Sequence, residues 1–124
     1  MKKIILLLLV CISFNCGAQF FNPAALQTVT SGSTVTVTQG VGHLLINPAS
    51  VLTTLTITFP ASPNDRDILV IRFGGTISSG VSVVTALTLS SVAGLMGTLP
   101  TTAVSGMCML WIYDASTGKW YRLI

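Results

Sequence analysis

Apolar residues alternate with threonine along two segments of the chain, and this period of two constrains the fold more than any other feature. Val35 and Val37 alternate with threonines within residues 33–38, and the same alternation recurs around Ile57 in residues 54–59. Successive side chains of a β-strand point to opposite faces, so this pattern is typical of a half-buried strand. We therefore expect an all-β protein.

Other segments rich in β-branched and aromatic residues predict further strands, separated by turns that contain glycine, proline, asparagine and aspartate. These segments are residues 67–73, 81–85, 86–90, 107–113 and 119–123. The first of them is apolar on both parities through its middle, which predicts a central strand covered on both faces. We expect a compact β-sandwich or jelly-roll-like domain of about eight to ten short antiparallel strands in residues 33–124.

The amino terminus has the pattern of a secretory signal peptide. Lys2 and Lys3 precede an unbroken apolar run over residues 4–12, and small residues lead up to Ala18. The run is shorter than the ~20 residues that span a bilayer. We expect residues 1–18 to be a signal peptide cleaved after Ala18, and the mature protein to be secreted or cell-surface, without a transmembrane segment. Lipoprotein processing at Cys16 is the alternative.

Removal of the signal peptide changes the charge and the cysteine content of the chain. It would take 18 of the 124 residues and leave 106, a length that suits one domain behind an extended lead-in over residues 19–32. The mature chain would carry four Lys and Arg against three Asp, without the basic patch that binds nucleic acid. Only Cys108 would remain, so stability must come from the core or from oligomerisation and not from an internal disulfide.

Titratable side chains are scarce, since the chain has no glutamate, three aspartates and one histidine, His43. Enzymes bring several such groups together, so we expect no enzyme activity, no catalytic residue, no cofactor and no metal. His43 lacks a co-ligand and is expected at a rim. Asp65 and Asp67 are expected in a turn with local side-chain hydrogen bonds and an Arg66 ion pair. Cys108, among apolar neighbours, is expected to be buried and inert, with an intermolecular bond as the alternative.

The last two predicted strands form a hairpin around the loop at residues 114–118, where Gly118 suits a positive φ. All the tryptophans and tyrosines of the chain lie in this hairpin: Trp111, Tyr113, Trp120 and Tyr121. They are our candidate contact residues for a glycan or a protein surface. The alternative is that they pack within the core and across the strands.

Four segments together resemble a small β domain of bacteriophage fibre, spike and related virion surface proteins. They are the proline-rich turn at residues 59–63, the strand ending in Phe-Gly-Gly at 72–75, the strand at 83–89 and the aromatic strand at 119–123. The resemblance implies a distal domain, often trimeric, that attaches to surfaces or caps a fibre. The signal peptide departs from that pattern and favours an exported bacterial protein.

The expected function is a non-catalytic secreted or surface-exposed structural or attachment module. It would act by self-association, as a homo-oligomer such as a trimer, or by binding a glycan or a surface protein. A phage-derived fibre-type virion protein and a small secreted hydrolase are the alternatives. Exposure of Met107, Trp111 or Leu89 would indicate a trimer or partner interface, whereas a closed monomer with a polar surface would indicate a free-standing binding module.

Overall fold

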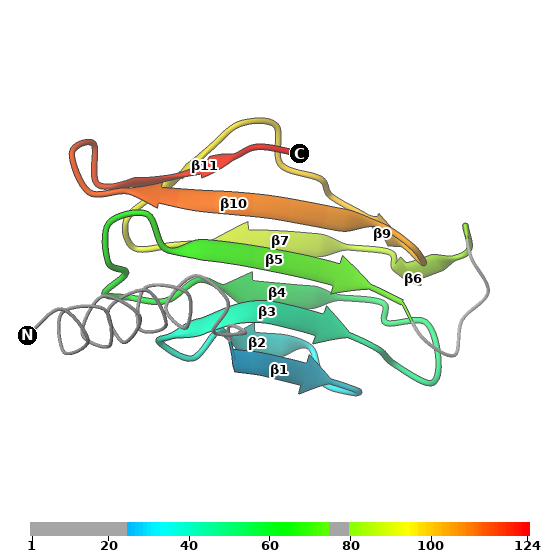
Figure 1. Ribbon diagram of the computed structural model, residues 1–124. Coiled ribbons are helices and arrows are strands. Elements are labelled where there is room, and N and C mark those ends of the chain that lie inside the picture. The colour runs from blue at the N-terminus through cyan, green and yellow to red at the C-terminus, as the bar shows by residue number, and fades with distance from the viewer. Residues whose placement is uncertain (1–24, 75–79) are drawn as a thin grey trace, which may run out of the picture.

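The computed structural model describes residues 25–74 and 80–124, and the regular structure within them is entirely β (Figure 1). The strands are β1 (Ala25–Val29), β2 (Thr34–Thr36), β3 (Val41–Ile46), β4 (Leu55–Thr58), β5 (Ile68–Phe73), β6 (Ser82–Val84), β7 (Leu87–Ser90), β8 (Leu95–Met96), β9 (Ala103–Val104), β10 (Cys108–Asp114) and β11 (Lys119–Arg122). The prediction of an all-β protein is confirmed for these residues, which contain no helix able to cross a membrane. The predicted signal peptide, its cleavage after Ala18 and the alternative at Cys16 lie outside them.

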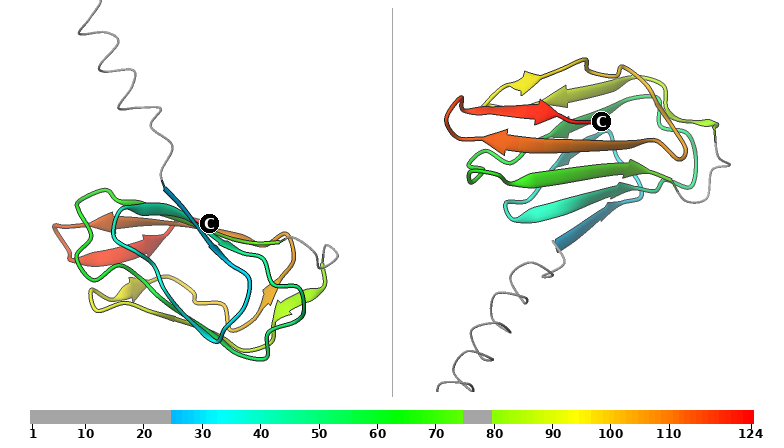
Figure 2. Two further views of the ribbon diagram at one scale, coloured as in Figure 1. Left: turned by 90° about the horizontal axis from the view of Figure 1, so that it is seen from below. Right: turned by 45° about the horizontal axis from the view of Figure 1, so that its top comes forward.

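The strands form two main layers, which are seen edge-on in Figure 2. One layer is a six-stranded sheet in the order β1-β3-β5-β10-β11-β8, and the other is a three-stranded sheet in the order β2-β4-β7. The chain alternates between the layers, so that β1, β3 and β5 stack in parallel in one sheet while β2, β4 and β7 stack in parallel in the other. The first part of the domain is therefore a coil of stacked passes, and the antiparallel strands β10 and β11 extend the six-stranded sheet.

The expected antiparallel arrangement of a sandwich or jelly roll is not what the structure shows. Five of the strand pairings described are parallel and three are antiparallel. Parallel neighbours need a crossover connection, and here a strand of the opposite sheet supplies it. The passes also differ in length: Leu26 pairs with His43, 17 residues later, and His43 with Val70, 27 residues later. Because no fixed repeat exists, the coil leaves no periodic signal in the sequence.

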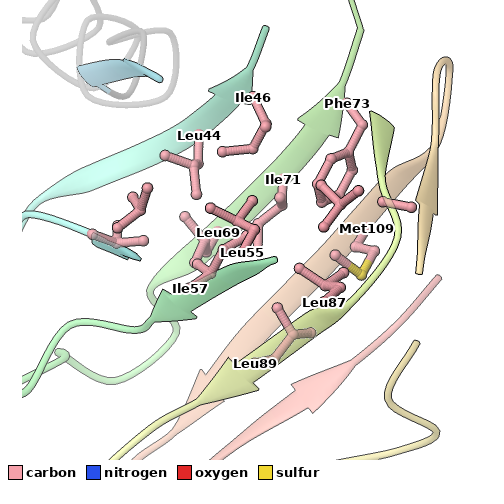
Figure 3. Close-up of a cluster of buried hydrophobic side chains, with 14 of the residues drawn as sticks. Leu44, Ile46, Leu55, Ile57, Leu69, Ile71, Phe73, Leu87, Leu89 and Met109 are labelled. Atoms are coloured by element: carbon pink, nitrogen blue, oxygen red, sulfur yellow. The ribbon is translucent and has the colours of Figure 1, made fainter. Parts of the chain in front are cut away.

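The core lies between the two sheets and is built from the inward parity of each strand (Figure 3). Its side chains stack in register across strands: Val35, Ile57 and Leu89 in the three-stranded sheet, and Leu44, Ile71 and Met109 in the six-stranded sheet. All of these residues are buried, which confirms the inward face predicted from the alternation in β2 and β4. The outward parity of the three-stranded sheet instead carries a row of hydroxyls from Thr34, Thr56 and Thr88.

Gln27 of β1 makes two hydrogen bonds to the outer edge of β2. Its Nε2 donates to the backbone oxygen of Thr36 at 3.0 Å, and its Oε1 accepts from the backbone N–H of Thr38 at 3.0 Å. Strand β2 pairs with β4 through its other edge, as the bond from Val37 N–H to the Thr58 carbonyl shows. The side-chain amide thus supplies bonds that a neighbouring strand would otherwise make.

Strand β5 lies centrally, as predicted, between β3 and β10. Its inward residues Leu69, Ile71 and Phe73 are fully buried. The prediction that both of its faces are covered is wrong for the described part of the chain, because Ile68 on the outward parity is 53% exposed. The outward side of β5 thus combines the exposed Ile68 and Arg72 with the half-buried Val70.

Candidate functional site

The predicted hairpin is confirmed, and it places the aromatic residues on two different faces of the six-stranded sheet. Strands β10 and β11 pair antiparallel from Trp111 opposite Arg122 to Asp114 opposite Lys119. The loop closes at Gly118, whose φ of 66° is the left-handed conformation that glycine adopts without strain. Within each strand, neighbouring residues then point alternately toward the core and away from it.

Both tryptophans belong to the core. Trp111 is 0% and Trp120 1% exposed, and the ring of Phe59 packs edge-on against each, with centroid distances of 5.2 and 5.3 Å. Tyr113 packs against Trp120 at 5.4 Å. The core-packing alternative therefore fits Trp111 and Trp120, whose side chains are almost wholly buried. Tyr113 and Tyr121 are only partly buried, and the contact role stays a prediction for these two.

Each indole N–H is buried without a hydrogen-bond partner among the described residues. A buried donor without a partner destabilises the folded state by about 1–3 kcal/mol. The large apolar area of each ring offsets that cost, which agrees with a packing role for the tryptophans.

The outward parity of the six-stranded sheet forms a continuous apolar surface, here called the outer face patch. It consists of Leu45, Ile68, Val70, Leu110, Ile112 and Tyr121. The strand register joins five of these residues, because Val70 pairs with Leu110, and Ile112 pairs with both Ile68 and Tyr121, whereas Leu45 is in register with Arg72. None of the six packs against the buried core cluster. A contiguous apolar surface of this kind marks an interaction site more often than isolated apolar residues do.

Five polar or reactive side chains accompany the patch. His43 pairs with Val70 in the middle, and Arg72 pairs with Cys108 at one end. At the other end, Asp114 of β10 pairs with Lys119 of β11, which is exposed on the same face. The prediction that Cys108 is buried is wrong, because its parity in β10 is that of Leu110 and it is exposed. His43, which was expected at a rim, lies within β3 and is exposed on the outward face of the sheet.

Asp114 is held in the hairpin turn by Ser116. Its Oδ1 accepts hydrogen bonds from the Ser116 hydroxyl at 2.6 Å and from the Ser116 backbone N–H at 2.8 Å. These two bonds, the hydroxyl first, stabilise the carboxylate and hold the pKa of Asp114 below its ordinary value, with a smaller contribution from Thr117. The charged form of Asp114 therefore favours the folded turn.

The Ser116→Ala variant is expected to raise the pKa of Asp114 toward its ordinary value, because the strongest hydrogen bond to the carboxylate is lost. Thr117→Ala should raise this pKa less. Since the folded pKa is depressed, the contribution of Asp114 to stability is present above the unfolded pKa and is lost as pH falls through the folded pKa. Titration of the Asp114 carboxyl by NMR measures both variants. An unchanged pKa in Ser116→Ala would contradict the assignment.

The turn before β5 has the predicted local bonds. Asp67 Oδ2 accepts from the backbone N–H of Asn64 at 2.8 Å, and Arg66 Nε lies 3.9 Å from Asp65 Oδ2. Asp65 also accepts from the backbone N–H of Ala115 at 2.9 Å, which ties this turn to the hairpin loop. The described residues contain no group of His, Cys or Asp side chains able to hold a metal ion.

Two hollows lie near this turn. The first, of about 240 Å³, lies between Gly40, Pro60, Asp67 and Trp120. The second, of about 390 Å³, brings Asp65 and Asp114 beside Ser116, but His43 does not line it. A serine without an imidazole lacks the base that a hydrolase nucleophile needs. The outer face patch is therefore the stronger candidate site.

Comparison with known proteins supplies a likeness in fold. No protein-family model and no curated protein matches the chain. A solved structure described as a chaperone–substrate complex aligns with a TM-score of 0.53 and 15% sequence identity, over 81% of this chain and 16% of that one. At this identity the match concerns the fold alone, and this chain corresponds to a small part of the other protein.

Proposed function

We propose that this protein is a non-catalytic, exported structural or attachment module that acts by association through its outer face patch. The observation that carries the proposal is that the six-stranded sheet has apolar residues on both faces, while only those of the inner face pack in the core and Ile68 of the outer face is 53% exposed. Removing apolar surface from water stabilises by about 25 cal/mol per Å². A partner that covers the patch would gain this free energy.

The composition and the resemblance support the same function. Acidic and imidazole groups are few, and the second hollow combines Asp114 with Ser116 but not with His43. The resemblance to phage fibre and spike domains implies attachment and self-association, and it also supports the alternative of a fibre-type virion protein. Tyr121 would contribute an aromatic ring to the contact, whether the partner is a protein or a glycan.

The double variant Ile68→Thr/Ile112→Thr tests the role of the patch. It exchanges two apolar side chains for β-branched polar ones that suit a strand, so the fold should persist while association weakens. Sedimentation velocity of the protein purified after expression of the full chain should show an assembly larger than one chain, and the double variant should sediment as a monomer.

Thr88→Ser, on the outward face of the other sheet, is the matched control and should sediment like the wild type. Far-UV circular dichroism checks that each variant is folded. Identical sedimentation of the wild type and the double variant would overturn the proposal.

A further inference from the structure

Strand β1 is the outermost strand of the six-stranded sheet, and within residues 25–74 and 80–124 no strand lies beyond it (Figure 1). In a parallel ladder, alternate residues direct both backbone groups to the same neighbour. The backbone oxygen of Val29 accepts a hydrogen bond from the N–H of Asn47, which directly follows β3. Val29 and Gln27 therefore direct their backbone groups to β3. Leu26 and Thr28 direct theirs outward, where the described chain supplies no partner.

The usual protections of an exposed edge are missing from β1. Natural β proteins protect such an edge with charged side chains, proline, a bulge or a covering segment. The sequence Ala-Leu-Gln-Thr-Val contains neither a charged residue nor a proline. The register shift between Ala25 and Leu26 puts the extra residue, Gly42, in β3 and not in β1. The neighbouring edge of β2, in contrast, is closed by the two hydrogen bonds of Gln27.

The surroundings of this edge carry no formal charge. The sequence has no Asp, Glu, Lys or Arg between Lys3 and Asp65, a stretch that includes the whole of β1, β2, β3 and β4. A charged segment added at this edge would lose hydration without gaining an opposite charge. The edge therefore favours an uncharged segment.

A hollow of about 370 Å³ adjoins β1 at this end of the sandwich. It lies inside a ring of the chain, which runs from Gln27 through the turn to Thr36 and is closed by the hydrogen bond between these two residues. Val35 lines the hollow together with hydroxyl-bearing residues such as Ser31 and Thr34. Its volume is at the lower end of the ~300–1,000 Å³ of ligand pockets. The lining suits a small side chain with a hydroxyl or an amide.

The length of the edge determines what size of partner it can take. Five residues of β1 extend over about 17 Å at ~3.3 Å per residue. A contact of this length is far smaller than the ~800 Å² per partner of a standard protein interface. It matches a short extended peptide, whose backbone can form hydrogen bonds with both outward residues.

We infer that the outer edge of β1 binds an extended, uncharged peptide segment of another protein, which pairs with Leu26 and Thr28 as an added strand. Alternate side chains of the added strand face the inside of the sandwich, where the hollow receives a serine, threonine or asparagine. In this mode of recognition, backbone hydrogen bonds provide affinity and pockets for alternate side chains provide specificity. The edge contains no residue of the outer face patch, so the inference goes beyond the proposed function.

A synthetic peptide tests this inference. The probe is an acetylated and amidated peptide with the sequence Ser-Thr-Val-Thr-Val-Thr of residues 33–38, which is uncharged and has high β propensity. Isothermal titration calorimetry with the protein purified after expression of the full chain should show binding. Hydrogen exchange followed by NMR should slow at the amides of Leu26 and Thr28. The amides of Gln27 and Val29, which already belong to the ladder with β3, should change less.

The Thr28→Pro variant removes one outward N–H without removing a bond to β3. Proline is tolerated on an edge strand when its position faces solvent, so the fold should persist. Peptide binding should weaken at least tenfold. Thr28→Val keeps the N–H and a β-branched side chain, and it is the matched control that should bind like the wild type. Far-UV circular dichroism checks that both variants are folded.

The outcomes distinguish this inference from the proposed function. Binding that slows exchange at Leu26 and Thr28 and is weakened by Thr28→Pro supports the added strand. Absence of binding at millimolar peptide, equal binding by Thr28→Pro and Thr28→Val, or slowed exchange at Thr34 and Thr36 of β2 instead overturns it. Ile68→Thr/Ile112→Thr should bind the peptide like the wild type, whatever its effect on self-association. An assembly of the protein alone that Thr28→Pro converts to a monomer would place a second copy at the edge and overturn the inferred partner.

Discussion

Replacing Phe59 with alanine is expected to lower the free energy of unfolding by about 3–5 kcal/mol. Phe59 is 1% exposed, and its ring packs edge-on against Trp111 and Trp120. Alanine would leave a cavity between the two indoles, which the surrounding sheets can fill only in part. Because domains are stable by only about 5–15 kcal/mol, this change should remove a large share of the total.

Phe59→Leu is the matched control, since it keeps an apolar side chain and removes the aromatic contacts. Each aromatic pair contributes about 0.5–1.5 kcal/mol beyond the buried area, so the loss should be smaller than for alanine. Urea denaturation measures both, and an unchanged slope shows that the same cooperative unit unfolds. An equal loss in the two variants would mean that the cavity between the indoles has no effect.

The Ile57→Ala variant is expected to lower the free energy of unfolding by about 2–5 kcal/mol. Ile57 is 0% exposed on the central strand of the three-stranded sheet, where it lies in register between Val35 and Leu89. Its removal opens a gap in a row that joins all three strands. The neighbouring rows are held by backbone ladders, so they cannot close the gap without shifting.

Thr56→Ala, one residue away on the outward face, provides the comparison. It changes β propensity and a partly exposed contact, so a loss of at most about 1 kcal/mol is expected. Urea denaturation of the two variants thus tests whether Ile57 points into the core and Thr56 points away from it. Comparable losses for Thr56→Ala and Ile57→Ala would contradict the orientation of this strand.

The parts of the fold that the sequence predicts are those determined locally. Alternation around Val35 and Ile57 identifies which side chains point inward, because the period of a strand is fixed by its backbone. The hairpin closed by Gly118 follows from a turn that needs a positive φ, and the bonds of Asp67 follow from aspartate chemistry in turns. Each of these features depends on residues close together in the chain.

The direction of each strand relative to its neighbours could not be predicted. Alternation indicates which face of a strand is buried, but not whether the neighbouring strand runs parallel or antiparallel to it. Strand β3 was missed for a related reason, since glycine and histidine in the segment Val-Gly-His-Leu-Leu-Ile resemble a turn followed by a short apolar run. Strands β8 and β9 have two residues each, too few to show any period. Their pairing depends on long-range contacts that one segment does not encode.

The candidate site was not identified from the sequence because its residues are mostly apolar. Apolar residues on both parities of β5 were interpreted as cover on both faces, yet they also fit a sheet that buries one face within the chain and offers the other to a partner. In β10 the inward parity belongs to Met109 and Trp111, which leaves Cys108 and Leu110 outside. Apolar residues on both parities of a strand indicate that each of its two faces can be buried. Which face the described chain buries is seen only in the structure.

The amide of Gln27 has a consequence for how copies of this protein can meet. An added strand at the edge of β2 would have to displace the two hydrogen bonds that Gln27 makes to Thr36 and Thr38. Edge-to-edge growth, the route by which β proteins polymerise into fibrils, is hindered there by one side chain. Under the proposed function, association would then use the outer face of the six-stranded sheet and not this edge of the three-stranded one.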